Sequence, residues 1–223
     1  MQRFFPIIFS IALISVGFGF LLLFLAEYFI PAWQEFLALS NPWLCALFVL
    51  IVCPLIGLAK LPISFRFSDV GGSINLLSVI FPFAILAYIY PSLNINWTWA
   101  HLAPAILSFF LFLSCSYPSQ KGAVIYRFVL PVSAIGSLFV LHAVLGHHIQ
   151  EFLWLAFASQ FIPLLIVDFV RTSQSAKLMD STQAFCIGQG GAKAPLWVAP
   201  SFALFISYLA HEFFWKTNSS FFG

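Results

Sequence analysis

Lysine and arginine residues in this chain fall almost entirely in alternate gaps between seven apolar segments. These segments are residues 4–26, 42–59, 73–91, 100–117, 128–146, 152–170 and 194–215. Each is close to the roughly 20 residues that an α-helix needs to cross about 30 Å of hydrocarbon. The pattern predicts an all-α fold in which residues 1–223 form a single domain, a polytopic integral membrane bundle of seven transmembrane helices.

The placement of the basic residues also predicts the orientation of the bundle. If the N-terminus is cytoplasmic, Lys216 alone lies outside, and the other basic residues lie on the cytoplasmic side: Arg3, Lys60, Arg66, Lys121, Arg127, Arg171, Lys177 and Lys193. Such an excess of cytoplasmic positive charge is typical of multi-pass proteins. We therefore expect a multi-pass protein of the cell inner membrane, with its N-terminus cytoplasmic and its C-terminus outside.

Aromatic side chains fit the same arrangement, because amphipathic rings favour the membrane–water boundary. The segmentation places one group at the outer boundary: Tyr28, Trp33, Trp43, Tyr90, Trp97, Trp99, Trp154 and Trp215. It places Tyr117, Tyr126 and Trp197 at the inner boundary.

Composition limits the class of protein and of partner. Hydrophobic residues make up 62% of the chain and charged residues only 7%, against about 25% charged residues in a soluble domain. This excludes an ordinary water-soluble core, and no basic face for nucleic acid is present. The predicted partners are the lipid bilayer and a small solute or ion, whereas the sequence leaves the oligomeric state open.

Two stretches of the chain resemble each other. The stretch from Val70 reads VGGSINLLSVIFPFAILAYIY and the stretch from Gln189 reads QGGAKAPLWVAPSFALFISYL. They share both glycines and the pairs Leu77/Leu196, Val79/Val198, Phe83/Phe202 and Ala84/Ala203. This similarity predicts a parallel internal repeat, in which the second and third helices correspond to the sixth and seventh. Such repeats are typical of transporters.

The same residues resemble a known family. A glycine pair before a mid-chain helix, Asp168 in LLIVDFV, and Gly190 and Gly191 in IGQGGAKAP are similar to motifs of the prokaryotic multi-pass membrane family called domain of unknown function 1614. The resemblance covers residues 50–91 and 160–210. The second motif of that family continues into Thr-Phe-Asp-Gly, whereas this chain continues from Lys193 as KAPL. The resemblance implies a multi-pass membrane architecture and no particular activity.

Two polar residues of the sixth segment are candidates for function. Asp168 lies near its cytoplasmic end, and a carboxyl group within a membrane is a candidate proton carrier. An alternative is that Asp168 forms an ion pair with Arg171, three residues further along the helix. Gln160 lies in the middle of the segment, so we expect it to face the bundle interior and to bond to another helix.

Glycine pairs before the third and seventh helices predict an anion site. Exposed backbone N–H groups at a helix N-terminus attract negative charge. The candidate residues are Gly71, Gly72, Gly190, Gly191, Lys193 and Arg66. Alternatively, the glycines only allow the chain to turn or to pack closely.

Histidines and carboxylates gather in the outer half of the predicted bundle, and these residue types bind zinc or iron. The candidate ligands are His142, His147, His148, His211 and Glu212. No pair has the spacing that places two ligands on one helical face, so no cofactor is expected, with zinc or iron kept as the alternative.

Three functional classes follow from these candidates. The preferred hypothesis is transport of a small solute or ion, with an anion among the candidates, by a protein that is not an enzyme. The alternatives are a metal-dependent membrane-embedded hydrolase and a non-catalytic membrane subunit or assembly factor.

Overall fold

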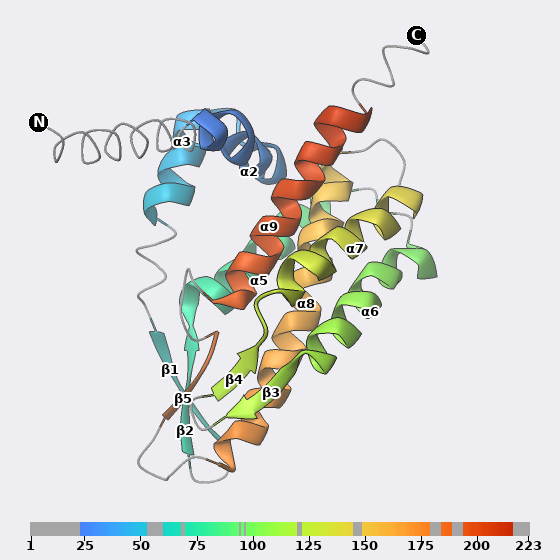
Figure 1. Ribbon diagram of the computed structural model, residues 1–223. Coiled ribbons are helices and arrows are strands. Elements are labelled where there is room, and N and C mark those ends of the chain that lie inside the picture. The colour runs from blue at the N-terminus through green and yellow to red at the C-terminus, as the bar shows by residue number, and fades with distance from the viewer. Residues whose placement is uncertain are drawn as a thin grey trace, which may run out of the picture.

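The computed structural model describes residues 23–52, 60–67, 70–93, 95, 97–119, 122–144, 149–178, 184–188 and 194–215 (Figure 1). Its α-helices are α2 (Ile30–Leu37), α3 (Pro42–Leu47), α5 (Phe81–Ile89), α6 (Trp99–Ser114), α7 (Val129–Val144), α8 (Ile149–Ala176) and α9 (Pro195–Ala210). Single π-helical turns at Leu25–Phe29, Phe48–Val52, Leu76–Ile80 and His211–Trp215 extend α2, α3, α5 and α9, and a 3-10 turn, Tyr90–Ser92, follows α5. The described chain is therefore mostly helical, as predicted.

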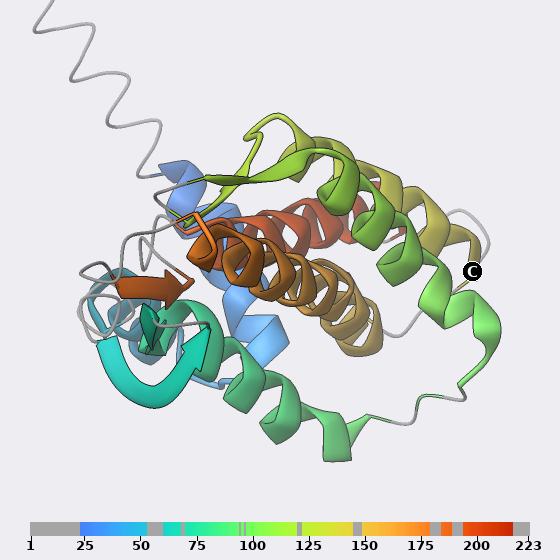
Figure 2. The same cartoon turned by 90° about the horizontal axis from the view of Figure 1, so that it is seen from below.

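Helix α8 forms the centre of the bundle. It packs against α6, α7 and α9 (Figure 2), and every residue from Phe152 to Phe161 is buried. A helix that is apolar around most of its circumference is typical of a protein core or of a membrane span, and between Phe152 and Phe161 protein covers α8 on all sides. The polar side chains of α8 must therefore find partners inside the protein.

The helices differ from the predicted segments mainly at their ends. The segment predicted at 152–170 is the helix 149–176, and the segment predicted at 73–91 begins at Leu76. The first segment was predicted to end at residue 26, but the helix there continues through Pro31 to Leu37. Pro31 lies where the π-helical turn Leu25–Phe29 gives way to α2, and a proline inside a helix is usually accompanied by such an irregularity because it removes a backbone hydrogen bond. Residues 1–22, where most of the first segment falls, lie outside the described residues.

Two small sheets at one end of the bundle depart from the all-α prediction. Strands β1 (Lys60–Phe67), β2 (Val70–Asn75) and β5 (Ala184–Ile187) form one sheet. Strands β3 (Ser116–Ser119) and β4 (Gly122–Ile125) form a hairpin. In β1, apolar residues alternate with others, as Leu61, Ile63, Phe65 and Phe67. This period of two is typical of a strand. A prediction that considers only long apolar segments does not detect it.

The parallel pairing of β2 with β5 bears on the predicted internal repeat. Gly72 lies opposite Phe185, and Ile74 lies opposite Ile187. Each strand leads towards a helix, β2 into the turn before α5 and β5 towards α9. The pairing brings residue 72 opposite 185, however, whereas the sequence repeat aligns residue 71 with 190. The superposition of the two halves therefore stays a prediction.

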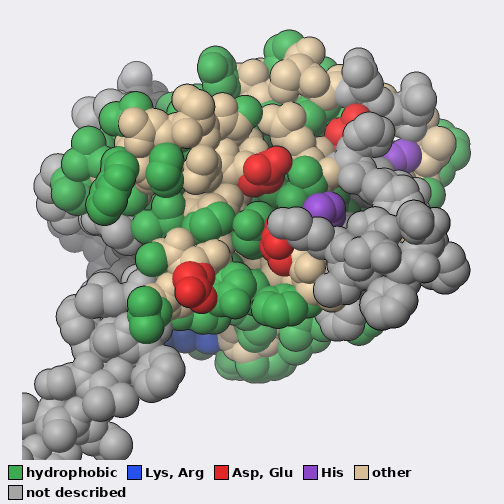
Figure 3. All heavy atoms as spheres, turned by 90° about the horizontal axis from the view of Figure 1, so that it is seen from above, with side chains coloured by type: hydrophobic (Ala, Val, Ile, Leu, Met, Phe, Trp, Pro, Cys, Tyr) green, Lys and Arg blue, Asp and Glu red, His purple; other side chains and the backbone are tan. Residues whose placement is uncertain are grey.

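Apart from Asp168, the acidic residues of the described chain lie at one end of the bundle and the basic residues that flank α7 and α8 lie at the other. Glu27, Glu35, Glu151 and Glu212 lie on elements at the end where α8 begins and α9 finishes, and Figure 3 shows acidic side chains and histidines on this face. Arg127 precedes α7, and Arg171 and Lys177 lie at the end of α8, which is the opposite end.

Two of the helices are long and apolar enough to span a membrane, namely Ile149–Ala176 and Pro195–Phe213. Shorter apolar helices cover Leu76–Ser92, Trp99–Ser114 and Val129–His142. The seven crossings of the sequence analysis therefore stay a prediction.

Trp33 is buried against Trp197, so the two side chains do not lie at opposite boundaries as predicted. Its side chain is 0% exposed and stacks on Trp197, which was predicted at the inner boundary, with ring centroids 5.3 Å apart. Trp33 also contacts Phe36 and Phe157 edge-on. The segment 30–37 thus inserts its aromatic face between α8 and α9, because aromatic rings bury a large apolar area.

We expect Trp33→Ala to destabilise the protein by about 3–5 kcal/mol, since it removes a fully buried ring. The measurement is thermal unfolding of the purified protein in detergent. Trp43→Ala is the matched control, because Trp43 is 82% exposed. Equal changes in the two variants would contradict the packing of α2 against α8 and α9.

Candidate functional site

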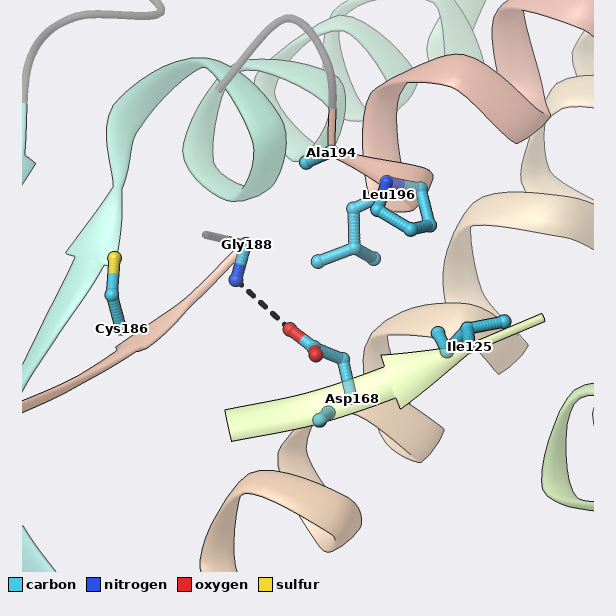
Figure 4. Close-up of a pocket in the computed structure, with 8 residues that line it drawn as sticks. Ile125, Asp168, Cys186, Gly188, Ala194 and Leu196 are labelled. Carbon is cyan, nitrogen blue, oxygen red and sulfur yellow. Dashed lines mark hydrogen bonds between the residues drawn. The ribbon is translucent and has the colours of Figure 1, made fainter. Parts of the chain in front are cut away.

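Asp168 is the best candidate for a functional group. It lies on α8 two turns before the helix ends, and its side chain is only 9% exposed. Its Oδ2 accepts a hydrogen bond of 2.9 Å from the backbone N–H of Gly188, at the end of β5 (Figure 4). A single hydrogen bond therefore ties the central helix to the larger sheet.

Gly188 holds this arrangement together. Its φ of 72° is a left-handed conformation that side chains with a Cβ disfavour. Its carbonyl accepts a hydrogen bond of 2.7 Å from Ser78 Oγ. The Asn75 carboxamide oxygen lies 3.0 Å from the same hydroxyl and accepts from the Ser78 N–H, so it caps the turn before α5. Helix α8, strand β5 and the start of the α5 helix thus meet at one residue.

A small cavity adjoins the carboxylate. Its volume is about 40 Å³, and β4, β5 and the first turn of α9 line it, through Ile125, Cys186, Ala194 and Leu196 among others (Figure 4). A water molecule needs roughly 10–15 Å³ of such space, so the cavity has room for a few waters or for a bare cation. The second carboxylate oxygen, Oδ1, accepts no hydrogen bond from the described residues.

No cation of the described residues pairs with Asp168. Arg171, the alternative partner, donates instead to the Leu113 carbonyl at 2.8 Å, to Ser116 Oγ at 3.0 Å and to Gln174 Oε1 at 3.0 Å. The arginine therefore binds the C-terminal end of α6, where carbonyl groups lack helical partners. The predicted pair between Asp168 and Arg171 is not formed.

Gln160 lies at a separate polar centre, where α6, α7 and α8 meet. It is 0% exposed and donates to Ser108 Oγ and Ser137 Oγ, each at 2.8 Å. Its carbonyl oxygen accepts from Ser133 Oγ. Gln160 thus faces the interior and bonds to two other helices, as expected from the sequence. Because its amide and carbonyl are both satisfied, this centre fastens helices together and offers no free group to a ligand.

The described glycines of the predicted anion site do not lie at a helix N-terminus. Gly71 and Gly72 lie inside β2, not at a helix N-terminus. A Cβ on Gly72 would overlap the ring of Phe185, so this glycine permits close packing of β5, which is the alternative considered for the sequence. Arg66 lies opposite Gly71 in the sheet register. Gly190, Gly191 and Lys193 lie outside the described residues.

The described candidate metal ligands lie on elements at the acidic end of the molecule. His142 is exposed near the end of α7, and His211 and Glu212 lie in the π-turn after α9. His147 and His148 lie outside the described residues. Within the described part of the chain, no three histidine, cysteine or acidic side chains lie close enough to share a metal ion.

Sequence reasoning missed Asn75, Ser78 and Gly188. Asn-x-x-Ser just before an apolar run is a helix N-cap pattern, and it was available at residues 75–78. Gly188, in contrast, carries no signal that distinguishes it from its neighbours, because its partners lie 20 residues before it and 110 residues before it in the chain.

Comparison with protein-family models, with curated proteins and with solved structures finds no match. The resemblance to domain of unknown function 1614 therefore stays a prediction.

Gly188→Ala should destabilise the protein by at least about 1–2 kcal/mol, the cost of a left-handed conformation for a residue with a Cβ. The new methyl group would also overlap Ser78 and lie 2.9 Å from Val79 Cγ2. Thermal unfolding in detergent measures the effect. Gly136→Ala is the control, since its Cβ meets only the end of the Leu107 side chain at 3.2 Å. A Gly188→Ala variant as stable as Gly136→Ala would disprove the role of Gly188.

Proposed function

We propose that the chain is a multi-pass protein of the cell inner membrane. Besides the two long apolar helices, the outer faces of α6 and α7 support this. Ile106, Phe110, Val132, Ile135 and Phe139 are each at least 43% exposed. A contiguous apolar surface of this kind is rare on soluble monomers and suits contact with lipid.

The separation of charge supports an orientation in which the sheets face the cytoplasm. Arg127, Arg171 and Lys177 lie at the sheet end, and positive charge favours the cytoplasmic side. The acidic end then faces outward.

Reporter fusions test this orientation. A reporter active only in the cytoplasm should work after Arg127 and after Lys177, and a reporter active only outside should work after Trp97 and at the C-terminus. The physical reason is that basic loops resist translocation. A cytoplasmic C-terminus would contradict both the orientation and the count of seven crossings.

Within this membrane protein, we infer that Asp168 binds an ion during transport of a small solute or ion. The observation that carries this proposal is a buried carboxyl group that faces a cavity and has no cationic partner among the described residues. A buried charge is costly unless it is paired. Such a group therefore favours binding a proton or a metal cation from solution.

The position of the carboxyl group favours a cation over an anion. Asp168 and the first residues of α9, Ala194 and Pro195, line the same cavity. A helix N-terminus attracts negative charge, but here the side chain of Asp168 already supplies it. A second anion at this place would be repelled by the ionised carboxylate. The transported or coupling ion is therefore a proton or a small cation.

Transport requires the bundle to open beyond this cavity. Between Gln160 and Asp168, about 12 Å apart along the helix axis, α8 presents Phe161, Leu164 and Val167, which are 0% exposed. This apolar layer separates the cavity from the acidic end. We infer that the structure is a closed state, and that α8 or α9 moves to connect Asp168 with the opposite side.

A lipid-soluble carbodiimide tests the proposed ion site, because it reacts with protonated carboxyl groups in apolar surroundings. We expect dicyclohexylcarbodiimide to label Asp168, with labelling that falls as the pH rises. Labelling should also fall when sodium or lithium competes at constant pH, if the ion is a metal cation. Mass spectrometry of the digested protein locates the label. Asp168→Asn should remove it, and Glu35→Gln, which alters an exposed carboxylate, should leave it unchanged.

The transport step is measured in liposomes that contain a pH-sensitive dye. With an imposed potential, wild-type protein should pass protons or respond to a sodium gradient, and Asp168→Asn should lose at least most of this flux while it remains folded. Labelling of Asp168 without any ion flux would contradict transport. Failure to label Asp168 in folded protein would contradict the ion site itself.

The second candidate is a non-catalytic membrane subunit, and the Gln160 centre favours it. Its hydrogen bonds are satisfied within the bundle, as expected of a protein whose helices stay in place. Absence of flux together with a full loss of folding in Asp168→Asn would support this candidate.

A further inference from the structure

A large apolar groove lies beside the Asp168 cavity, between α9 on one side and β4, Arg127 and the start of α7 on the other. Its volume is about 700 Å³. Pro195, Val198 and Phe202 line it from α9, and Ile125, Leu130 and Pro131 line it from the other side. The three α9 residues recur at a spacing of three and four, so they form one face of the helix. We refer to this feature as the α7–α9 groove.

One charged side chain lies at the α7–α9 groove. Arg127 is exposed and lines the groove, and its guanidinium group makes no hydrogen bond or ion pair within the described part of the chain. Two exposed aromatic residues, Tyr126 and Phe128, flank it, and their rings stack at 5.9 Å. Tyr117 packs against Tyr126 at 5.7 Å. Aromatic rings beside a basic residue are typical of the headgroup level of a membrane.

We propose that the α7–α9 groove binds an anionic phospholipid, with the acyl chain along α9 and the phosphate at Arg127. The argument is charge complementarity, because a guanidinium without a partner among the described residues, at the edge of an apolar groove, matches a molecule with one anionic end and one apolar end. The volume of the groove lies within the range of about 300–1,000 Å³ that holds small ligands. The site is distinct from the Asp168 carboxyl group.

The position of the groove agrees with lipid as the occupant. It adjoins the apolar outer surface of α7, where Val132 is 52% exposed. It also shares Ala123, Ile125 and Pro195 with the wall of the Asp168 cavity. A lipid in the groove therefore lies one residue layer from the carboxyl group.

Photo-crosslinking tests the proposal in phosphatidylcholine nanodiscs. The probes are two phospholipids with a diazirine on the acyl chain, one with a phosphatidylglycerol headgroup and one with a phosphatidylcholine headgroup. Mass spectrometry should place adducts on Pro195, Val198 and Phe202. The anionic probe should be preferred about fivefold, since one basic residue near an anionic headgroup contributes about 1 kcal/mol. Unlabelled phosphatidylglycerol should compete with it.

Matched variants separate the groove from general contact with lipid. Arg127→Gln should abolish the headgroup preference, whereas Lys177→Gln, which removes an exposed charge at the same end, should keep it. Val198→Trp should fill the groove and reduce adducts from both probes. Val132→Trp, outside the groove, should not. Gel filtration verifies that each variant is folded. The competition with unlabelled phosphatidylglycerol uses the wild-type protein, so its result does not depend on the folding of any variant.

Two results would overturn the proposal. One is equal labelling of the groove by both probes in the wild-type protein. The other is labelling of Val198 and Phe202 no stronger than labelling of Phe139, which is 70% exposed on the outer face of α7.

Discussion

Burial of α8 is the constraint on which the rest of the structure depends. Where α8 is buried, no water solvates its polar side chains, so each buried polar side chain must find a partner or remain costly. Gln160 meets this requirement through serines of α6 and α7. Asp168 meets it only in part, through the N–H of Gly188. Gln160 therefore has hydrogen-bond partners for both its amide and its carbonyl group. Asp168, further along the same helix, has a described partner for only one carboxylate oxygen.

This difference separates a structural role from a functional one. A saturated network holds a single arrangement of helices, because every alternative would leave polar groups unpaired. A carboxyl group with one hydrogen bond, a cavity beside it and no described cation gains a partner when an ion enters. The sheets contribute by placing Gly188, whose left-handed conformation directs its N–H to α8 and its carbonyl to Ser78.

The sheet end of the bundle also carries the groups that we propose contact lipid. Arg127, the neighbouring aromatic residues and the α7–α9 groove lie there, beside the wall of the Asp168 cavity. If this end lies at the cytoplasmic boundary, headgroups, acyl chains and water all come within a short distance of one carboxyl group. The ion site and the lipid site are nevertheless separable, since Arg127 and Asp168 can be changed independently.

Sequence patterns alone determined the helical character of the chain, the approximate helices, the inward position of Gln160 and the choice of Asp168 as a candidate. Long apolar runs, and isolated polar residues within them, are local signals. In a helical bundle the apolar runs form helices and the isolated polar residues face other helices. The tertiary structure alone decided that Trp33 lies on Trp197, that Arg171 binds the end of α6 instead of Asp168, and that Gly188 and Ser78 complete the site. It also decided that residues 60–67 and 70–75 form strands, because β2 pairs with β5, more than 100 residues further along the chain, and β1 pairs with β2. These features depend on contacts between distant segments, and the physical reason they escaped prediction is that no local pattern specifies which distant partner a side chain meets.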